Sequence, residues 1–241
     1  MKRVLITWWT KGIGYAIAEK FAREWYDICI TYFHDNKWAE FSINKLKEIW
    51  VDAIAIQANS WNKNDLQKVF DIYWKTNILI NNIWSYLPDL HEWDWEDMFN
   101  HHLMWTVRST ELFAEQLEWK WKIVNISSVA GHNPWAWHKC IWLESYCCMK
   151  AAVNMYTKIC ANKFWWKILV NAISPWNTST PARDWADKNR ISCREKNSVI
   201  WRFIKPEEIA KIVYATIDNE WINGQIVTVD GGEVARWYEI D

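Results

Sequence analysis

The stretch RVLITWWTKGIG, residues 3–14, joins an apolar, β-branched run to a loop that carries two glycines. The run RVLIT is typical of a buried parallel strand, and residues 13–24 are typical of an amphipathic helix. Gly12 and Gly14 would let the backbone approach a pyrophosphate at the helix N-terminus, where free N–H groups favour anions. A plain strand-to-helix turn is the alternative for two glycines alone.

The same alternation continues along the whole chain. Further strands are expected at 27–32, 52–57, 78–82, 122–127, 167–173 and 225–230, and helices between them at 37–49, 63–75, 92–117, 145–163 and 205–218. Strands alternating with helices form right-handed βαβ units. The sequence therefore predicts an α/β fold with one domain over 1–241. Its core would be a Rossmann-type doubly wound parallel sheet of about seven strands, with helices on both faces.

The composition excludes several classes of protein. The formal net charge of −1 gives no electrostatic case for a nucleic-acid or membrane partner. No run reaches the roughly 18 apolar residues of a membrane span, and the start of the chain lacks a signal-peptide pattern. The six cysteines have no metal-ligand spacing and favour reduced thiols over a disulfide framework. We therefore expect a cytoplasmic protein without a metal site.

A second constellation follows the strand at 122–127. This strand ends beside Ser128, and Tyr146 and Lys150 stand at i and i+4, on one face of the next helix. An ammonium one turn away stabilises a phenolate, so we expect the pKa of Tyr146 to fall below its ordinary value near 10. The hydroxyl would then act as a general acid or base near neutrality. A solvated helix face is the alternative for this spacing, but the preceding strand and serine favour catalysis.

These motifs together resemble the short-chain dehydrogenase/reductase family, and within it the 3-oxoacyl-carrier-protein reductases. The matching segments, in order, are TWWTKGIG (7–14), NNIW (81–84), IVNISSVAG (123–131), YCCMK (146–150), VNAISPWNTST (170–180), RFIKPEEIA (202–210) and NGQIVTVDGG (223–232). The resemblance implies an NAD(P)-dependent oxidoreductase that transfers a hydride between a nicotinamide cofactor and a carbonyl or alcohol. A non-catalytic nucleotide-sensing or scaffold protein on the same fold is the alternative.

The resemblance also implies roles for individual residues. Tyr146 would be the acid/base, Ser128 would hold the substrate oxygen, and Lys150 would bind the nicotinamide ribose and tune Tyr146. The implied cofactor-binding residues are Thr7, Lys11, Gly12, Ile13, Gly14, Asn59, Asn82, Tyr146, Lys150, Pro175, Thr178 and Thr180. The substrate would be a small molecule or an acyl-carrier conjugate, and residues 177–200 would form the substrate loop.

The choice of cofactor depends on charge. NAD-preferring relatives end the second strand with an acid that binds the ribose hydroxyls. Here Tyr32 stands at that place, and the next acid is Asp35. Lys11 could pair with a 2′-phosphate as a point charge. These residues favour NADP and leave NAD open.

Some parts of the chain depart from the family pattern. His102 aligns with an Asn that often completes a proton relay, and the pair His101–His102 is typical of a solvated helix surface. The loop 132–144 is longer than usual and would form a lid or rim. By resemblance we expect a homo-oligomer, a dimer or tetramer, that pairs the helices at 92–117 and 145–163. Apolar residues on more than one face of the second helix agree with this: Ala151, Val153, Met155, Tyr156 and Ile159.

The composition is abnormal in one respect. The chain has 23 Trp and 6 Gly, whereas average usage predicts roughly 17 Gly. Tryptophan stands where the family carries glycine at Trp8, Trp84 and Trp176, and likewise at Trp25, Trp105, Trp121 and Trp201. Some bacteria read the codon UGA as glycine, and another code reads it as tryptophan. The hypothesis is that many of these tryptophans are mis-decoded glycines, whereas Trp95 is a genuine tryptophan.

Overall fold

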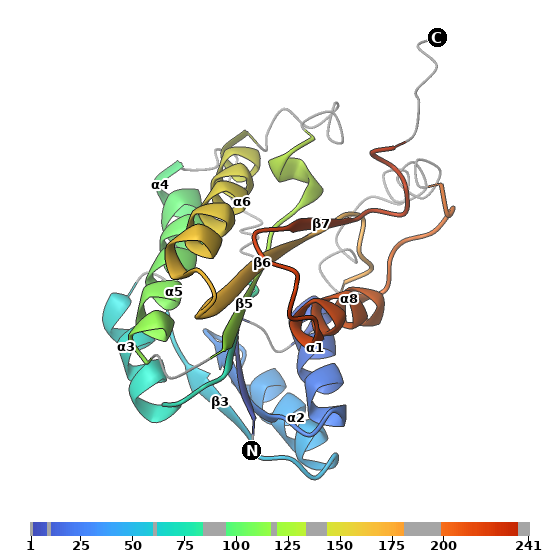
Figure 1. Ribbon diagram of the computed structural model, residues 1–241. Helices are drawn as coiled ribbons and strands as arrows, with labels where there is room; N and C mark the ends of the chain where they lie inside the picture. Colours follow the sequence, from blue (N-terminus) through green and yellow to red (C-terminus); the bar gives the residue numbers. More distant parts are fainter. Residues whose placement is uncertain are drawn as a thin grey trace.

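The computed structural model describes residues 2–8, 11–59, 62–83, 95–116, 120–133, 144–180 and 199–235. Its centre is a seven-stranded sheet in the order β3-β2-β1-β4-β5-β6-β7 (Figure 1). The strands are β1 (Arg3–Thr7), β2 (Asp27–Tyr32), β3 (Ala53–Gln57), β4 (Ile78–Asn81), β5 (Trp121–Ile126), β6 (Ile168–Pro175) and β7 (Ile226–Val229). Every neighbouring pair is parallel. The predicted doubly wound α/β fold is confirmed.

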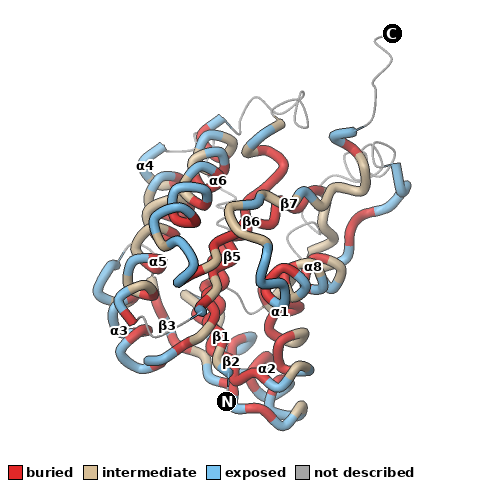
Figure 2. Tube along the Cα trace, viewed as in Figure 1, coloured by how far each residue is buried: buried red, intermediate tan, exposed pale blue. Residues whose placement is uncertain are grey.

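Helices cover both faces of this sheet (Figure 1). On one face lie α1 (Gly12–Arg23), α2 (Asn36–Lys47) and α8 (Pro206–Asp218), and on the other α3 (Lys63–Ile72), α5 (Trp105–Glu115) and α6 (Glu144–Phe164). Because side chains alternate along a strand, Val4 and Ile6 join the core under α1, and Leu5 joins the core on the opposite face. Figure 2 shows the resulting pattern, with buried strands between helices that are exposed on their outer sides.

One expected helix is interrupted. The structure divides the described part of 92–117 into α4 (Trp95–Met98), a π-helical turn η1 (Phe99–Met104) and α5. A π-helical turn adds residues to the helical repeat and so changes which side chains face inward. His101 and His102 are 5% and 1% exposed. The expectation that this pair lies on a solvated surface was therefore wrong.

A buried polar network joins the sheet to two helices. The Asn81 amide donates to Asn125 Oδ1 at 2.9 Å, and the Asn125 amide donates to Thr157 Oγ1 of α6 at 2.9 Å. From α5, Ser109 Oγ donates to Asn81 Oδ1 at 2.6 Å. Buried groups of this kind are costly unless they are paired, so they favour a single arrangement. The network fixes α6, which carries Tyr146 and Lys150, against β4 and β5.

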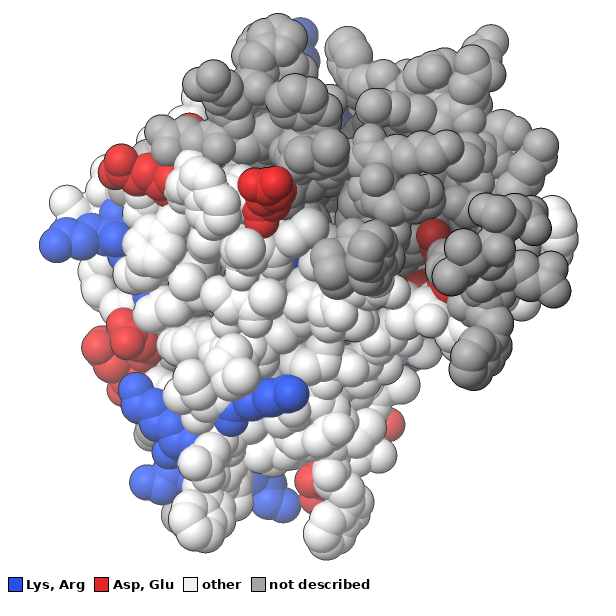
Figure 3. Space-filling model, turned by 90° about the horizontal axis from the view of Figure 1, so that it is seen from above, with Lys and Arg blue, Asp and Glu red and all other residues white. Residues whose placement is uncertain are grey.

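The order of the strands defines where a ligand would bind. The chain passes from β1 to a helix on one face of the sheet and from β4 toward helices on the other, so the carboxyl ends of β1 and β4 form the switch point. Figure 3 views the molecule from the top of Figure 1, the side on which these strands end, and the described acidic and basic side chains there are interspersed. Among the described helices, none has the length and apolar character needed to cross a membrane.

Candidate active site

Ser128 and α6 meet where β5 ends. Ser128 begins the short 3-10 helix η2 (Val129–Gly131), and its Oγ accepts a hydrogen bond from the Ala130 N–H at 3.2 Å. A Cβ on Gly131 would lie 2.6 Å from the Lys150 carbonyl carbon. The absence of a side chain at Gly131 therefore lets η2 pack directly on α6. This packing brings Ser128 within hydrogen-bonding reach of the Tyr146 side chain.

Lys150 is enclosed beneath this pair. Its ammonium donates to the carbonyl oxygens of Ile126 at 2.9 Å and Ile83 at 3.3 Å. Nζ lies 5.7 Å from the centroid of the Tyr146 ring. Burial lowers the pKa of Lys150 to about 7, because the charged form loses its hydration. The sequence correctly placed Tyr146 and Lys150 on one helical face, and the structure brings Ser128, which the resemblance also implied, to the same cluster.

The pKa of Tyr146 moves in the direction opposite to the expected one. Burial raises the pKa of Tyr146 to about 12, although the hydrogen bond with Ser128 partly offsets this rise. The expected fall was wrong because the charged phenolate loses its hydration on burial. Tyr146 is consequently protonated at neutral pH.

His102 contacts the same cluster from η1. Its ring meets the Tyr146 ring edge-on, with centroids 5.3 Å apart and an interplanar angle of 87°. Neither ring nitrogen has a hydrogen-bond partner among the described residues. Burial, with a smaller effect from Lys150, places the pKa of His102 well below its ordinary value, so the ring is neutral. The sequence indicated this position as a departure from the family but gave no sign that the imidazole would be enclosed.

The loop after β1 has several features of a phosphate site. Gly12 begins α1 with a φ of 58°, and no described side chain caps the first turn of this helix. Gly14 is buried in that turn, and Ile13 packs against the core. At the end of β1, Thr7 Oγ1 accepts from the Asn82 N–H at 3.3 Å. These residues leave the α1 N–H groups available to an anion.

Lys11 is engaged by its neighbours. Its ammonium lies 2.7 Å from Asp35 Oδ2 and 4.4 Å from the centroid of the Trp38 ring. Asp35 also caps α2 through the Trp38 N–H at 3.3 Å. Asp35, which the sequence placed beyond the end of β2, therefore contacts Lys11 in the loop after β1.

The remaining predicted cofactor residues lie at strand ends. The Asn59 N–H, after β3, donates to Asp65 at 2.9 Å. Pro175 is the last residue of β6, and Thr178 forms an isolated bridge with Ile204, with Thr180 close behind it in the chain. The expectations for Trp84, for most of the loop 132–144 and for most of the substrate loop 177–200 fall outside the described residues.

Two indoles also lie at the carboxyl ends of strands, because Trp8 follows β1 and Trp176 follows β6. The Trp8 ring stacks on Phe33 at 5.8 Å and meets His101 edge-on at 6.2 Å. Trp176 is 4% exposed and packs in the cluster that contains Tyr146. Lys11, Gly12 and Lys150 fit a dinucleotide, and the Trp8 indole belongs to the loop that leads from β1 to Gly12. Sequence analysis identified both positions without showing what the rings would contact.

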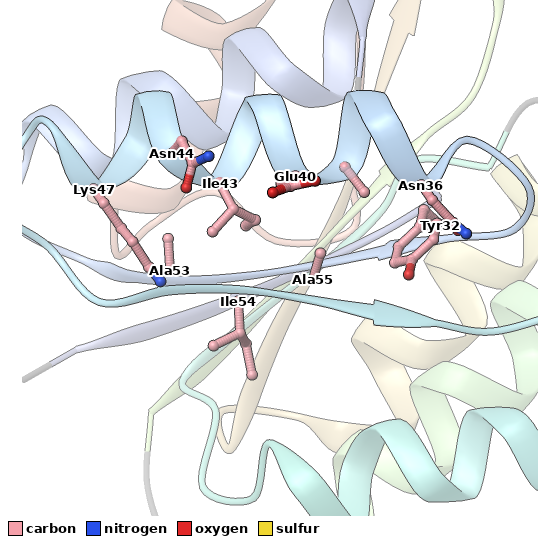
Figure 4. Close-up of a pocket in the computed structure, with 10 residues that line it drawn as sticks. Tyr32, Asn36, Glu40, Ile43, Asn44, Lys47, Ala53, Ile54 and Ala55 are labelled. Atoms are coloured by element: carbon pink, nitrogen blue, oxygen red, sulfur yellow. The ribbon is translucent and has the colours of Figure 1, made fainter.

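A separate groove of about 570 Å³ lies between α2 and the edge strand β3 (Figure 4). Glu40 and Lys47 of α2 face Ala53 and Ala55 of β3, and Tyr32 stands at one end. The groove contains none of the residues that cluster at Tyr146. The groove is therefore separate from the candidate active site at the carboxyl ends of β4 and β5.

Comparison with known proteins agrees with this fold. Residues 9–233 match the family described as enoyl-(acyl carrier protein) reductase. The 3-oxoacyl-[acyl-carrier-protein] reductase FabG of Staphylococcus aureus is 26% identical over 246 residues, 96% of this chain and 97% of that protein. The diacetyl reductase of Staphylococcus epidermidis is 24% identical over 261 residues, 98% of this chain and 99% of that protein.

A solved structure extends the comparison. The short-chain dehydrogenase of Burkholderia cenocepacia in complex with NADP superimposes with a TM-score of 0.82 at 26% identity, over 97% of this chain and 98% of that one. The chain belongs to the short-chain dehydrogenase/reductase family of oxidoreductases, which confirms the resemblance seen in its motifs.

Proposed function

We propose that this protein is an NADP-dependent reductase of carbonyl compounds, with Tyr146 as the proton donor. The observation that carries the proposal is the enclosed cluster of Ser128, Tyr146 and Lys150 at the carboxyl end of β5. A nicotinamide cofactor, when bound, supplies the hydride. The protein's own residues must then hold the substrate oxygen and deliver one proton to it.

The contacts of these three residues support a different role in the reaction for each of them. The Ser128 and Tyr146 side chains lie within hydrogen-bonding reach of each other, so both hydroxyls can contact one substrate oxygen. A pKa of about 12 for Tyr146 keeps the phenol protonated until an alkoxide, a much stronger base, forms beside it. Lys150, with a pKa of about 7, is a close source of a replacement proton and of positive charge.

Lys11 is the residue that supports the proposed preference for NADP. In the described structure Lys11 is paired with Asp35, 2.7 Å away. A 2′-phosphate carries more charge than one carboxylate and would compete for the same ammonium. Asp35 opposes this preference, because it could instead accept hydrogen bonds from the ribose hydroxyls of NAD.

The relatives suggest which substrates to try first. Their names include a 3-oxoacyl-[acyl-carrier-protein] reductase and a diacetyl reductase, so we propose a 3-oxoacyl thioester or a small diketone. The test is to mix the protein with NADPH and either an acetoacetyl thioester or diacetyl, and to follow NADPH oxidation. Both the chain with tryptophan at position 8 and a Trp8→Gly variant should be assayed. No oxidation with either form and either substrate contradicts the proposal.

The indole of Trp8 favours a second candidate, a non-catalytic sensor or scaffold on the same fold. If the chain functions with Trp8 stacked on Phe33, its dinucleotide site is obstructed. For the chain with Trp8, no NADPH binding in calorimetry and no turnover in the same assay would support a scaffold, whereas binding without turnover would support a sensor. Turnover would exclude both.

A further inference from the structure

Tryptophan is over-represented where the backbone is left-handed. Eight described non-glycine residues have a positive φ, and five of them are Trp8 (55°), Trp25 (63°), Trp50 (68°), Trp165 (54°) and Trp201 (55°). The other three are Lys75, Lys120 and Asn177. Glycine adopts this region at no steric cost, whereas a bulky side chain there is an outlier. Tryptophan contributes 23 of 241 residues in the chain, so its share of these positions calls for a specific cause.

The end of α1 shows what the backbone requires. The Trp25 N–H donates to the Ala22 carbonyl at 3.0 Å, and the Tyr26 N–H donates to the Phe21 carbonyl at 3.1 Å. This pair of bonds is the Schellman motif, whose left-handed residue is usually glycine. Trp25 occupies that residue. The hydrogen bonds are satisfied, but the side chain is the wrong one for the conformation.

Four of the five indoles gain little from burial. Trp25, Trp50, Trp165 and Trp201 are 67%, 85%, 73% and 71% exposed. A large apolar side chain offsets conformational strain only when it is removed from water. These positions therefore combine strain with exposure of an indole, and glycine would relieve both.

Trp8 differs because its indole is partly buried. The ring lies against Phe33, after β2, and against His101 of η1. It thus spans the carboxyl ends of β1 and β2, directly before the uncapped first turn of α1. Removing the indole would leave a space beside Phe33 and His101, next to the loop that leads into α1.

We infer that Trp8, Trp25, Trp50, Trp165 and Trp201 are glycine in the functional protein, and that glycine at position 8 opens the seat for a dinucleotide's phosphates. One codon read in two ways accounts for all five positions. The second half of the inference rests on the proposed function, whereas the first half rests on the backbone alone. Trp50 and Trp165 are identified by their φ angles and not by any sequence motif. Trp105, Trp121 and Trp176 are buried and have no positive φ, so this argument does not extend to them.

Peptide masses test the inference directly. The protein is purified from its native host and digested, and mass spectrometry determines the masses and sequences of the peptides that contain the five positions. We expect glycine at all five. Tryptophan at these positions would overturn the inference, whatever the protein's activity.

Thermal unfolding without cofactor tests the conformational argument. Each of Trp25→Gly, Trp50→Gly, Trp165→Gly and Trp201→Gly should raise the Tm by about 2–4 °C, the shift expected for a single relieved strain in a domain of this size. The control is Trp221→Gly, because Trp221 is 95% exposed and has no positive φ. It should leave the Tm unchanged or lower it, since glycine adds freedom to the unfolded chain. A uniform fall in all five variants would overturn the inference.

A binding measurement separates the two halves. NADPH should raise the Tm of Trp8→Gly and should not raise that of the chain with tryptophan, because only the open loop binds a ligand of the folded state. The variants at the four exposed positions could gain stability while NADPH leaves the Tm of Trp8→Gly unchanged. The assignment of glycine would then hold, and the proposal that glycine at position 8 opens a cofactor site would be wrong. Equal responses to NADPH in both chains would show that the Trp8 indole does not obstruct the site.

Discussion

At the scale of single residues, the proposed chemistry rests on protons held by Tyr146 and Lys150. The sequence predicted both positions from their spacing, because i and i+4 residues share a helical face. It predicted the wrong direction for the Tyr146 pKa shift, because that direction depends on burial by residues far away in the sequence. Its pKa of about 12 keeps the phenol protonated at neutral pH.

Replacing Tyr146 with Phe should remove the proton donor and keep the ring. Turnover should fall by about 10²-fold or more, the scale of general acid catalysis. The matched control is Tyr156→Phe on the same helix, whose hydroxyl donates to the Val107 carbonyl at 3.5 Å. Steady-state rates with NADPH and an accepted carbonyl provide the measurement. Equal rates in Tyr146→Phe and Tyr156→Phe would refute the role of Tyr146.

A second prediction concerns the pair of Lys11 and Asp35. Lys11→Ala should narrow the preference for NADPH over NADH by about tenfold, the lower end for loss of a charge-assisted bond. Asp35→Asn should widen that preference, because it frees Lys11 while keeping a cap for α2. The readout is kcat/KM for both cofactors, with Lys37→Ala as an exposed charge-matched control. A parent protein that prefers NADH would rule out this account.

At the scale of elements, the sequence predicted every strand of the sheet to within two residues. Apolar β-branched runs identify strands buried on both faces, and this signal is local. The π-helical turn η1 was not predicted, because 92–117 has the periodicity of one helix and the interruption depends on packing against α6 and the sheet. The inward rotation of His101 and His102 was missed for the same reason.

The outer face of α6 carries the prediction about assembly. Met155 and Ile159 are 58% and 53% exposed and stand one turn apart, with Cys148 and Ala151 also exposed on this helix. We propose that a second copy covers this apolar stripe in a homo-oligomer. Met155→Glu should shift the particle toward the monomer in light scattering at micromolar concentration, whereas Lys45→Glu on α2 should not. A monomeric parent protein would disprove the proposal.

At the scale of the whole molecule, burial of charge at the site costs stability. The pKa of Lys150 is about 7 in the folded protein and about 10.4 in an unfolded chain. Above pH 7 the unfolded chain keeps this proton and the folded protein releases it. The free energy of unfolding should therefore rise with pH, because stability increases wherever the unfolded state binds more protons. Burial also lowers the pKa of Lys122, which acts in the same direction.

The useful window for this measurement lies between about pH 7 and 8.5. Burial also lowers the pKa values of His101 and His102. The free energy of unfolding therefore rises as histidine loses its proton in the unfolded chain, and this rise is largely complete by about pH 7. Above the window, burial raises the pKa of Cys29, so stability falls as unfolded cysteine ionises near pH 8.5. Within the window Lys150 should add about 1–2 kcal/mol, since a full pH unit is worth about 1.4 kcal/mol.

Lys150→Met should remove most of this rise, because methionine fills a similar space without a charge. Urea unfolding at pH 7.0, 7.5, 8.0 and 8.5 would measure the slope in the parent protein and in the variant, with exposed Lys158→Met of α6 as the control. The parent and Lys158→Met should share a positive slope, and Lys150→Met should be flatter. Lys150→Met should also be more stable than the parent protein at pH 7, because half of the folded parent molecules still bury the ammonium at that pH. A slope unchanged by Lys150→Met would mean that the ammonium is hydrated in solution. The proposal that Lys150 is an enclosed proton source would then be wrong.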